Sequence, residues 1–186
     1  MSFHSMGRWP PRAAALSGLL MLTGLAGLLA LWPAPGLAAE AYAARVTRVF
    51  DGDTVWVKPL AGGPYRKLRL DAIDAPEICQ RGGETARDRL AARVLRQVVW
   101  VEEGAADTYG RGLARLQHQG DDINRWLVAS GQAWAYEWRV GEGPYAGAQK
   151  QAKRARRGVF AQANVETPRD FRRRHGPCPL PERKGR

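Results

Sequence analysis

The sequence predicts an α+β fold built on a small closed β-barrel. Three β-rich segments follow one another with only short turns between them, and two more lie further along the chain. Helical patterns are inserted late and never alternate with strands in the long βα units of a parallel, Rossmann-type sheet. Five strands in this order are typical of a small barrel.

The strands are predicted from β-branched and aromatic residues that lie between turn-forming residues. The first two strands form a hairpin around Asp51-Gly52-Asp53-Thr54, because Asp-Gly is a common hairpin turn. The third strand ends before Pro76, since proline cannot continue the hydrogen-bond ladder. The expected strands cover residues 42–49, 54–57, 66–73, 98–101 and 113–117.

Helices are predicted over residues 84–97, 123–130 and 145–157. In the first, Ala86, Leu90 and Val94 recur at helical spacing, with arginines between them. The other two end at Gly131 and Gly158, because glycine commonly terminates helices. From residue 167 onward, an Arg-rich sequence with prolines and glycines predicts an irregular basic extension.

The charge of the chain points to a polyanionic partner. The 186 residues include 29 Lys and Arg against 18 Asp and Glu, which gives a net charge of +11. Fixed positive charge attracts phosphates and releases their counterions, so nucleic acid and an acidic membrane surface both fit. The length favours one domain with appendages.

The N-terminus has the three-part plan of a secretory signal. Arg8 and Arg12 precede an uncharged apolar run over residues 13–32, and small residues follow at 36–39. The run approaches the roughly 20 residues that span a bilayer, so an uncleaved membrane anchor through residues 13–32 is the alternative. Loss of the first 38 residues removes two arginines and no acid, so the folded part keeps the basic character.

Export bears on the two cysteines, Cys79 and Cys178. In an oxidising compartment we expect them to form a disulfide, which would hold the C-terminal tail beside Asp74 and Glu77. The alternative is two unpaired thiols. No Cys/His spacing in the sequence suggests a zinc site.

Charged side chains collect where two predicted strands end. Arg69, Asp74 and Glu77 lie within nine residues at the end of the third strand. Asp53 alone reads as part of a turn, but if the two strands are neighbours, Asp53 and Asp74 can share a hard cation such as Ca²⁺. Glu77 would then contact a metal-bound water.

A further arginine, Arg111, lies between Gly110 and Gly112. Glycines on both sides clear space, so the guanidinium can offer its fork to phosphate oxygens. Taken alone, this pattern is also typical of a hairpin bulge with a solvated arginine.

Together and in order, three motifs closely resemble the staphylococcal nuclease family, in particular its exported bacterial homologues. The resemblance covers about residues 44–160. The motifs are Asp51-Gly52-Asp53-Thr54, then Leu-Arg-Leu with Ile-Asp-Ala-Pro-Glu at 68–77, and Asp-x-Tyr-Gly-Arg-Gly-Leu at 107–113.

The resemblance implies a five-stranded OB-fold barrel with about three α-helices, a calcium cofactor and a set of site residues. It assigns the calcium to Asp53, Asp74 and the carbonyl of Ala75. It assigns phosphate binding to Arg69 and Arg111, the general base to Glu77, and nucleotide contacts to Tyr109 and Tyr136. Ala75 replaces the family's common threonine, and Thr108 stands where the staphylococcal enzyme has a lysine.

The implied activity is calcium-dependent, largely sequence-nonspecific hydrolysis of DNA and RNA at the 5′-oxygen to phosphorus bond, which leaves 3′-phosphate ends. Single-stranded or breathing nucleic acid is the expected substrate, and a monomer is the default for the family. The alternatives are an OB-type module that binds nucleic acid without cleaving it, and an envelope protein whose basic tail docks on anionic lipid.

The expected domain plan has three parts. Residues 1–39 form the signal peptide or N-terminal membrane anchor, residues 40–165 the nuclease-like OB-fold domain, and residues 166–186 the basic Pro/Arg-rich tail. This plan predicts export across the bacterial inner membrane to the periplasm or the medium, or, with an uncleaved anchor, a protein that faces outward from the membrane.

Overall fold

The computed structural model describes residues 40–136 and 142–178. The predicted signal peptide or anchor, residues 1–39, therefore lies outside the described residues, as does the apolar run 13–32. Within the part of the chain that the structure describes, no helix combines the length and apolar character needed to cross a bilayer.

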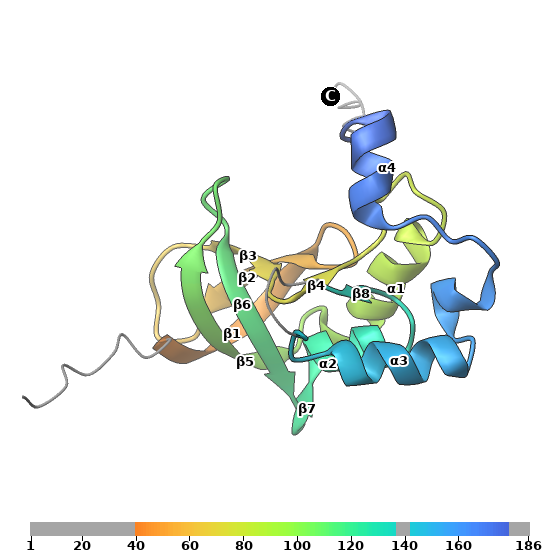
Figure 1. Cartoon of the computed structure of the whole chain (residues 1–186). Helices are drawn as coiled ribbons and strands as arrows, with labels where there is room; N and C mark the ends of the chain where they lie inside the picture. The colour runs from red at the N-terminus through yellow and green to blue at the C-terminus, as the bar shows by residue number, and fades with distance from the viewer. Residues whose placement is uncertain (1–39, 137–141, 179–186) are drawn as a thin grey trace, which may run out of the picture. The chain divides into compact units, whose positions relative to one another are not determined.

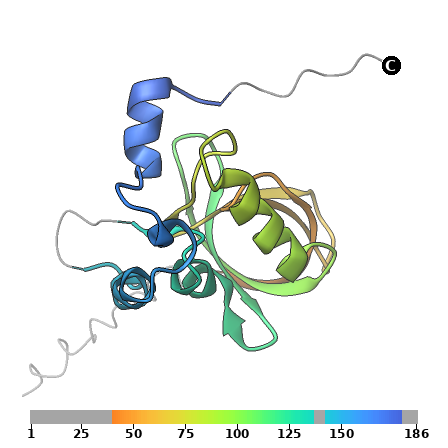
Figure 2. The ribbon, with the colours of Figure 1, turned by 90° about the vertical axis from the view of Figure 1, so that its right-hand side faces the viewer.

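Five strands form a closed barrel, which confirms the predicted fold class (Figure 1). Antiparallel pairing gives the order β3-β2-β1-β5-β6, and parallel pairing of β3 with β6 closes the ring. Figure 2 shows this ring nearly end-on. The strands are β1 (Glu40–Val49), β2 (Thr54–Pro59), β3 (Arg66–Leu70), β5 (Val98–Ala106) and β6 (Gly112–His118).

The third strand is shorter than predicted, and this correction matters for the site. We expected a continuous strand over 66–73, but β3 ends at Leu70. Ala72 has φ of 60°, a left-handed conformation that breaks the ladder. The chain then forms β4 (Ile73–Asp74), which pairs with β8 (Trp134–Ala135) in a separate two-stranded sheet.

Four α-helices and one 3₁₀ turn occur within the described residues. Ala86, Leu90 and Val94 of α1 are buried, as predicted, and α1 lies across one end of the barrel (Figure 2). The third predicted helix, 145–157, is shorter than expected, because α3 ends at Arg154, and a 3₁₀ turn follows from Gly158. The elements are α1 (Gly83–Val94), β7 (Asp121–Asp122), α2 (Ile123–Ala129), α3 (Ala146–Arg154), η1 (Gly158–Ala161) and α4 (Pro168–His175).

The prediction of an irregular tail is wrong for residues 168–175, which form α4. Thr167 caps this helix, because its hydroxyl oxygen accepts a hydrogen bond from the backbone N–H of Asp170 at 3.2 Å. Pro168 occupies the first turn, where its missing N–H costs nothing, and Gly176 with φ of 73° follows the last residue. Four basic residues, Arg172 to His175, occupy the last turn, where positive charge interacts favourably with the negative end of the helix dipole.

The barrel interior is filled by one apolar cluster that also takes in α1 and α2. Its largest side chains are fully buried and come from the barrel strands and from both helices. Burial on this scale fixes the ends of β2, β3 and β4, from which the polar side chains described next project. These core residues include Val46, Val55, Leu68, Leu70, Leu90, Leu116, Ile123 and Leu127.

Candidate active site

The register of β2 and β3 brings the two predicted carboxylates to one place. Thr54 pairs with Arg69, so Asp53 lies directly beside the end of β3, and its carbonyl accepts a hydrogen bond from Leu70 N–H at 2.7 Å. The turn at Ala72 then returns the chain so that Asp74, in β4, faces the same end. Both carboxylates are buried.

Arg69 joins these two carboxylates. Its Nη1 lies 2.9 Å from Asp53 Oδ2, and its Nη2 lies 3.0 Å from Asp74 Oδ1. Ala75 N–H also donates to Asp53 Oδ2, at 2.7 Å. One guanidinium therefore bridges the two acids, rather than extending alone toward a ligand.

The environment of Asp53 makes its ionised form less favourable than it is in water. Burial raises the pKa of the Asp53 carboxyl to about 6, an effect that the Arg69 cation opposes and the nearby Asp51 carboxylate reinforces. Asp51 is also fastened to this turn, since its Oδ1 accepts a hydrogen bond from Asp53 N–H at 3.0 Å. A further cation at this position would favour the ionised form of Asp53.

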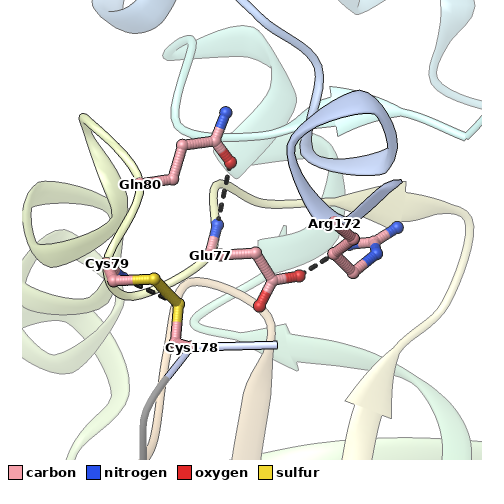
Figure 3. The surroundings of a disulfide bond; sticks show 5 residues. All are labelled: Glu77, Cys79, Gln80, Arg172 and Cys178. Carbon is pink, nitrogen blue, oxygen red and sulfur yellow. Dashed lines mark hydrogen bonds and ion pairs between the residues drawn. A yellow bond between two sulfur atoms is a disulfide. The ribbon is translucent and has the colours of Figure 1, made fainter. Parts of the chain in front are cut away.

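Glu77 follows Asp74 after Pro76 and contacts an arginine from the far end of the chain. Arg172 Nη1 lies 2.7 Å from Glu77 Oε1 (Figure 3). The same guanidinium donates to both oxygens of Asp74, at 3.1 and 3.0 Å. The backbone of Glu77 is held too, because its N–H donates to Gln80 Oε1 at 3.1 Å.

The predicted disulfide between Cys79 and Cys178 is present (Figure 3). It connects the loop that carries Glu77 to the segment after α4. A second connection lies on the other side of α4, where Gln80 Nε2 donates to the carbonyl of Glu166 at 2.8 Å. The tail is therefore packed beside Asp74 and Glu77, as the sequence predicts for a disulfide-bonded pair.

Arg111 lies in the loop between β5 and β6, and Asp107 of the same loop holds it. Asp107 Oδ2 lies 2.7 Å from both Nε and Nη2 of Arg111. Asp107 Oδ1 accepts the backbone N–H groups of Tyr109 and Arg111, each at 2.9 Å. Burial would raise the pKa of Asp107, but these hydrogen bonds outweigh it and hold the pKa below its ordinary value.

All eight site residues predicted from the sequence line one open cleft of about 1370 Å³. Tyr109 and Tyr136 are exposed, with 83% and 55% of their surface accessible, so both rings are available to a ligand. The lining holds six carboxylates and five cationic side chains, although the whole chain is strongly basic. The eight residues are Asp53, Arg69, Asp74, Ala75, Glu77, Tyr109, Arg111 and Tyr136.

Sequence reasoning missed two residues of this cleft. Arg172 was hidden in a run of arginines that resembled a solvated tail. A signal for its helix was nevertheless present, since Thr167, Pro168 and Asp170 form an N-terminal capping pattern. Asp107 stood in a recognised motif without a role, although an aspartate that precedes a glycine turn commonly bonds the following backbone N–H groups.

Comparison with known proteins places the chain in a family. The family described as staphylococcal nuclease homologue matches residues 67–162, about half of the chain. A micrococcal nuclease of Shigella flexneri is 38% identical over 140 residues, which cover 69% of this chain and 79% of that protein. The chain belongs to the staphylococcal nuclease family.

Two other relatives match a larger share of the chain than the micrococcal nuclease does. An uncharacterized endonuclease of Haemophilus influenzae is 32% identical over 154 residues, 83% of this chain and 85% of that protein. Protein ParB of Escherichia coli is 34% identical over 164 residues, 82% of this chain and 91% of that protein. Membership identifies the chain as a nuclease, a hydrolase of the micrococcal nuclease type.

The matched family segment contains most of the cleft but not all of it. Of the eight predicted site residues, only Asp53 lies before residue 67. Arg172 and Cys178 lie beyond residue 162. The C-terminal contribution to the cleft is therefore a feature of this chain outside the matched segment.

Proposed function

We propose that this nuclease is calcium-dependent and hydrolyses DNA and RNA with little sequence preference, at the 5′-oxygen to phosphorus bond, leaving 3′-phosphate ends. The observation that carries the proposal is the convergence of two buried carboxylates, a third carboxylate and two arginines of the predicted set in one cleft. These are Asp53, Asp74, Glu77, Arg69 and Arg111.

The donor set fits a hard cation. An ionised carboxylate offers about four lone-pair sites. Asp53 uses three, for Ala75 N–H, Arg69 and the Thr54 hydroxyl, and Asp74 uses three, for Arg69 and two bonds from Arg172. Each carboxylate therefore keeps about one site for a ligand, counting partners among the described residues.

Calcium suits a site with few protein ligands. Among the described residues, no group of three or more His, Cys, Asp or Glu side chains is arranged to hold a metal ion. Calcium accepts carboxylate, backbone carbonyl and water oxygens together and tolerates irregular geometry. Asp53, Asp74 and the carbonyl of Ala75 would hold it, and the raised pKa of Asp53 reflects a buried acid that a cation would stabilise in its ionised form.

We assign the two predicted arginines of the cleft to the negative charge of the phosphate. Arg111 uses Nε and Nη2 for Asp107, so its guanidinium is fixed in direction at the lining of the cleft. Arg69 holds the two acids together and brings a positive charge to the same place. When bound, calcium supplies further positive charge beside the phosphodiester, and preorganised charge of this kind is usually the largest catalytic contribution.

Glu77 is the group that we assign to the attacking water. Its carboxylate accepts the proton of the water, whose oxygen forms the new bond to phosphorus. The bond from phosphorus to the 5′-oxygen breaks, and the 5′-oxygen takes the electron pair and then a proton from solvent. The products are a 3′-phosphate end and a 5′-hydroxyl end, so atoms and charge balance.

Substrate breadth follows from the exposed rings of the cleft. Tyr109 and Tyr136 offer surfaces on which any base can stack, and the arginines contact phosphates that every sequence shares. Splayed bases are accessible in single strands and in duplexes that breathe. We therefore expect faster cleavage of heat-denatured DNA and of RNA than of stable duplex.

The proposed setting is an exported monomer. The Cys79–Cys178 disulfide supports export, because disulfides persist in oxidising compartments and are rare in the cytosol of mesophiles. The signal-like sequence at residues 1–39 points the same way. Export through a cleaved signal predicts that the mature N-terminus of the natural protein begins near residue 39.

The test is a calcium titration of cleavage on heat-denatured DNA, followed by analysis of the product ends. We expect cleavage that EGTA abolishes and calcium restores. The products should be extended by a DNA polymerase only after phosphatase treatment, because a 3′-phosphate blocks extension. Ends that are extended without phosphatase would contradict the proposed bond, and cleavage that persists in EGTA would contradict the proposed cofactor.

A further inference from the structure

The C-terminal helix α4 adds an arginine to the cleft that the assigned residues do not include. The Arg172 guanidinium bonds both oxygens of Asp74 and one oxygen of Glu77. We propose that Arg172 is a positioning residue of the active site, which fixes the Glu77 carboxylate relative to Asp74. This inference rests on the proposed function, because it assigns Arg172 a task toward Glu77 as the general base.

The geometry favours a positioning role. Asp74 and Glu77 carry like charges on either side of Pro76, and like charges this close repel each other. A guanidinium presents rigid donors in one plane, so a single arginine can bind two carboxylates in a fixed relation. Arg172 does so with contacts of 2.7 Å to Glu77 and 3.0 Å to Asp74.

Arg172 reaches the site because α4 is fastened on both sides. Before the helix, the Glu166 carbonyl accepts a hydrogen bond from the side-chain amide of Gln80, and Pro168, the first helical residue, is buried. After the helix, Cys178 is joined to Cys79. Both connections end on the loop that also carries Glu77, as Figure 3 shows for the disulfide. The helix and the general base therefore belong to one cross-linked unit.

A different role for the same contacts is competition. Arg172 could occupy acceptor sites that a metal ion would otherwise use, and its removal would then activate the enzyme. The lone-pair count argues against this, because Asp74 keeps about one acceptor site with Arg172 in place. The two roles predict opposite changes in turnover at saturating calcium.

The experiment compares the full chain with Arg172→Ala, Arg172→Lys and Arg169→Ala in steady-state cleavage of a single-stranded oligonucleotide at saturating calcium. Arg169 is exposed on the same helix and does not line the cleft, so its variant controls for loss of charge from α4. Arg172→Ala should lower kcat about 10- to 100-fold, as expected for a misplaced reacting group, with KM changed less than about threefold.

Two further readouts separate positioning from a general structural role. Arg172→Lys should remain well below wild type, because an ammonium is a point charge and cannot bridge two carboxylates as a planar fork does. Guanidinium ion at millimolar concentration should restore part of the kcat of Arg172→Ala, whereas methylammonium should restore less. Thermal unfolding detects loss of folding in any variant. If Arg172→Ala does not fold, the kcat of Arg172→Lys is compared with that of wild type instead.

The disulfide gives an independent variant. Cys79→Ser with Cys178→Ser should lower kcat in the same direction as Arg172→Ala, and adding Arg172→Ala to it should lower kcat by less than in the intact protein. Unchanged or raised kcat in Arg172→Ala, while wild type cleaves with calcium, would overturn the inference alone. Wild-type protein that does not cleave with calcium would overturn the proposed function and the inference with it.

Discussion

The Asp107 carboxylate binds the Arg111 guanidinium through two contacts of 2.7 Å, and Asp107 lies four residues earlier in the same loop. The other Asp107 oxygen closes the turn by accepting two backbone N–H groups. One side chain therefore determines both the shape of the loop and the direction of the arginine. A loop that is shaped by its own aspartate can hold the Arg111 guanidinium in place without contacts from the barrel core.

Asp107→Asn should reduce activity because Asp107 holds the guanidinium of Arg111 in place. The amide keeps one acceptor oxygen but loses the charge that binds Arg111, so the guanidinium gains freedom. We expect kcat to fall about 10-fold or more, with a smaller effect than Arg111→Ala. Steady-state cleavage of the same oligonucleotide by both variants checks the order. A wild-type rate in Asp107→Asn would show that Arg111 needs no such partner.

The same substitution should change how stability depends on pH. Because the pKa of Asp107 in the folded protein lies below its ordinary value of 3.8, ionised Asp107 stabilises the fold. This stabilisation is fully present above pH 3.8 and is lost as the pH falls through the folded-state pKa. The difference in unfolding free energy between wild type and Asp107→Asn, about 1 to 3 kcal/mol at pH 7, should therefore shrink in strong acid. Urea titrations at pH 7 and pH 3 measure it, and a difference that grows in acid would contradict this assignment.

Arg69→Ala and Arg111→Ala should both lower turnover by orders of magnitude but differ in stability. Arg69 bridges two buried carboxylates, and its removal leaves both without their shared cation, at a cost of about 3 to 5 kcal/mol. Arg111 pairs with one carboxylate at the rim, so its removal should cost less. Chemical unfolding without metal measures the contrast, and calcium should restore part of the stability of Arg69→Ala. Near-native turnover in either variant would contradict the assigned roles.

Gly52→Ala should destabilise the fold, because Gly52 lies in the hairpin turn where that turn packs closely against Ala75 and Ala86. A Cβ added there would lie 2.6 Å from the Ala75 Cβ and 2.8 Å from the Ala86 Cβ. Overpacking of this kind typically costs about 1 to 3 kcal/mol, and movement of Ala75 should also weaken calcium binding. Gly147→Ala is the control, since that position in α3 meets nothing within 4 Å and helix propensity predicts a small gain in stability. Equal stability of the two variants in urea would contradict the packing argument.

The barrel and most of the cleft could be predicted from the sequence because local patterns specified them. Alternating apolar residues specified the strands, and the three ordered motifs specified the family. The break at Ala72 was not predictable from pattern, since alanine rarely adopts positive φ and the run from Leu68 to Ile73 reads as one strand. After the break, β4 pairs with β8, and this partner lies sixty residues away in the sequence, counted from Asp74 to Trp134.

The position of Arg172 in the site was not predicted, because it depends on contacts between residues far apart in the sequence. The side chain of Arg172 meets Asp74 at a separation of 98 residues, and no periodicity within an arginine-rich segment distinguishes one arginine from its neighbours. The disulfide was the one sequence feature that placed the tail near Glu77. Arg69 illustrates the same limit, because its role as a bridge between Asp53 and Asp74 follows from the register of β2 and β3.

Glu77 is proposed to activate water in a calcium-dependent nuclease. The most direct measurement is hydrolysis of heat-denatured DNA by purified residues 39–186 and by their Glu77→Gln variant, each in Ca²⁺ and in EGTA. We expect calcium-dependent cleavage by wild type that falls at least about 100-fold in the variant, while binding of the DNA persists. Tight binding without cleavage under any divalent ion, or equal cleavage by the two proteins, would contradict it.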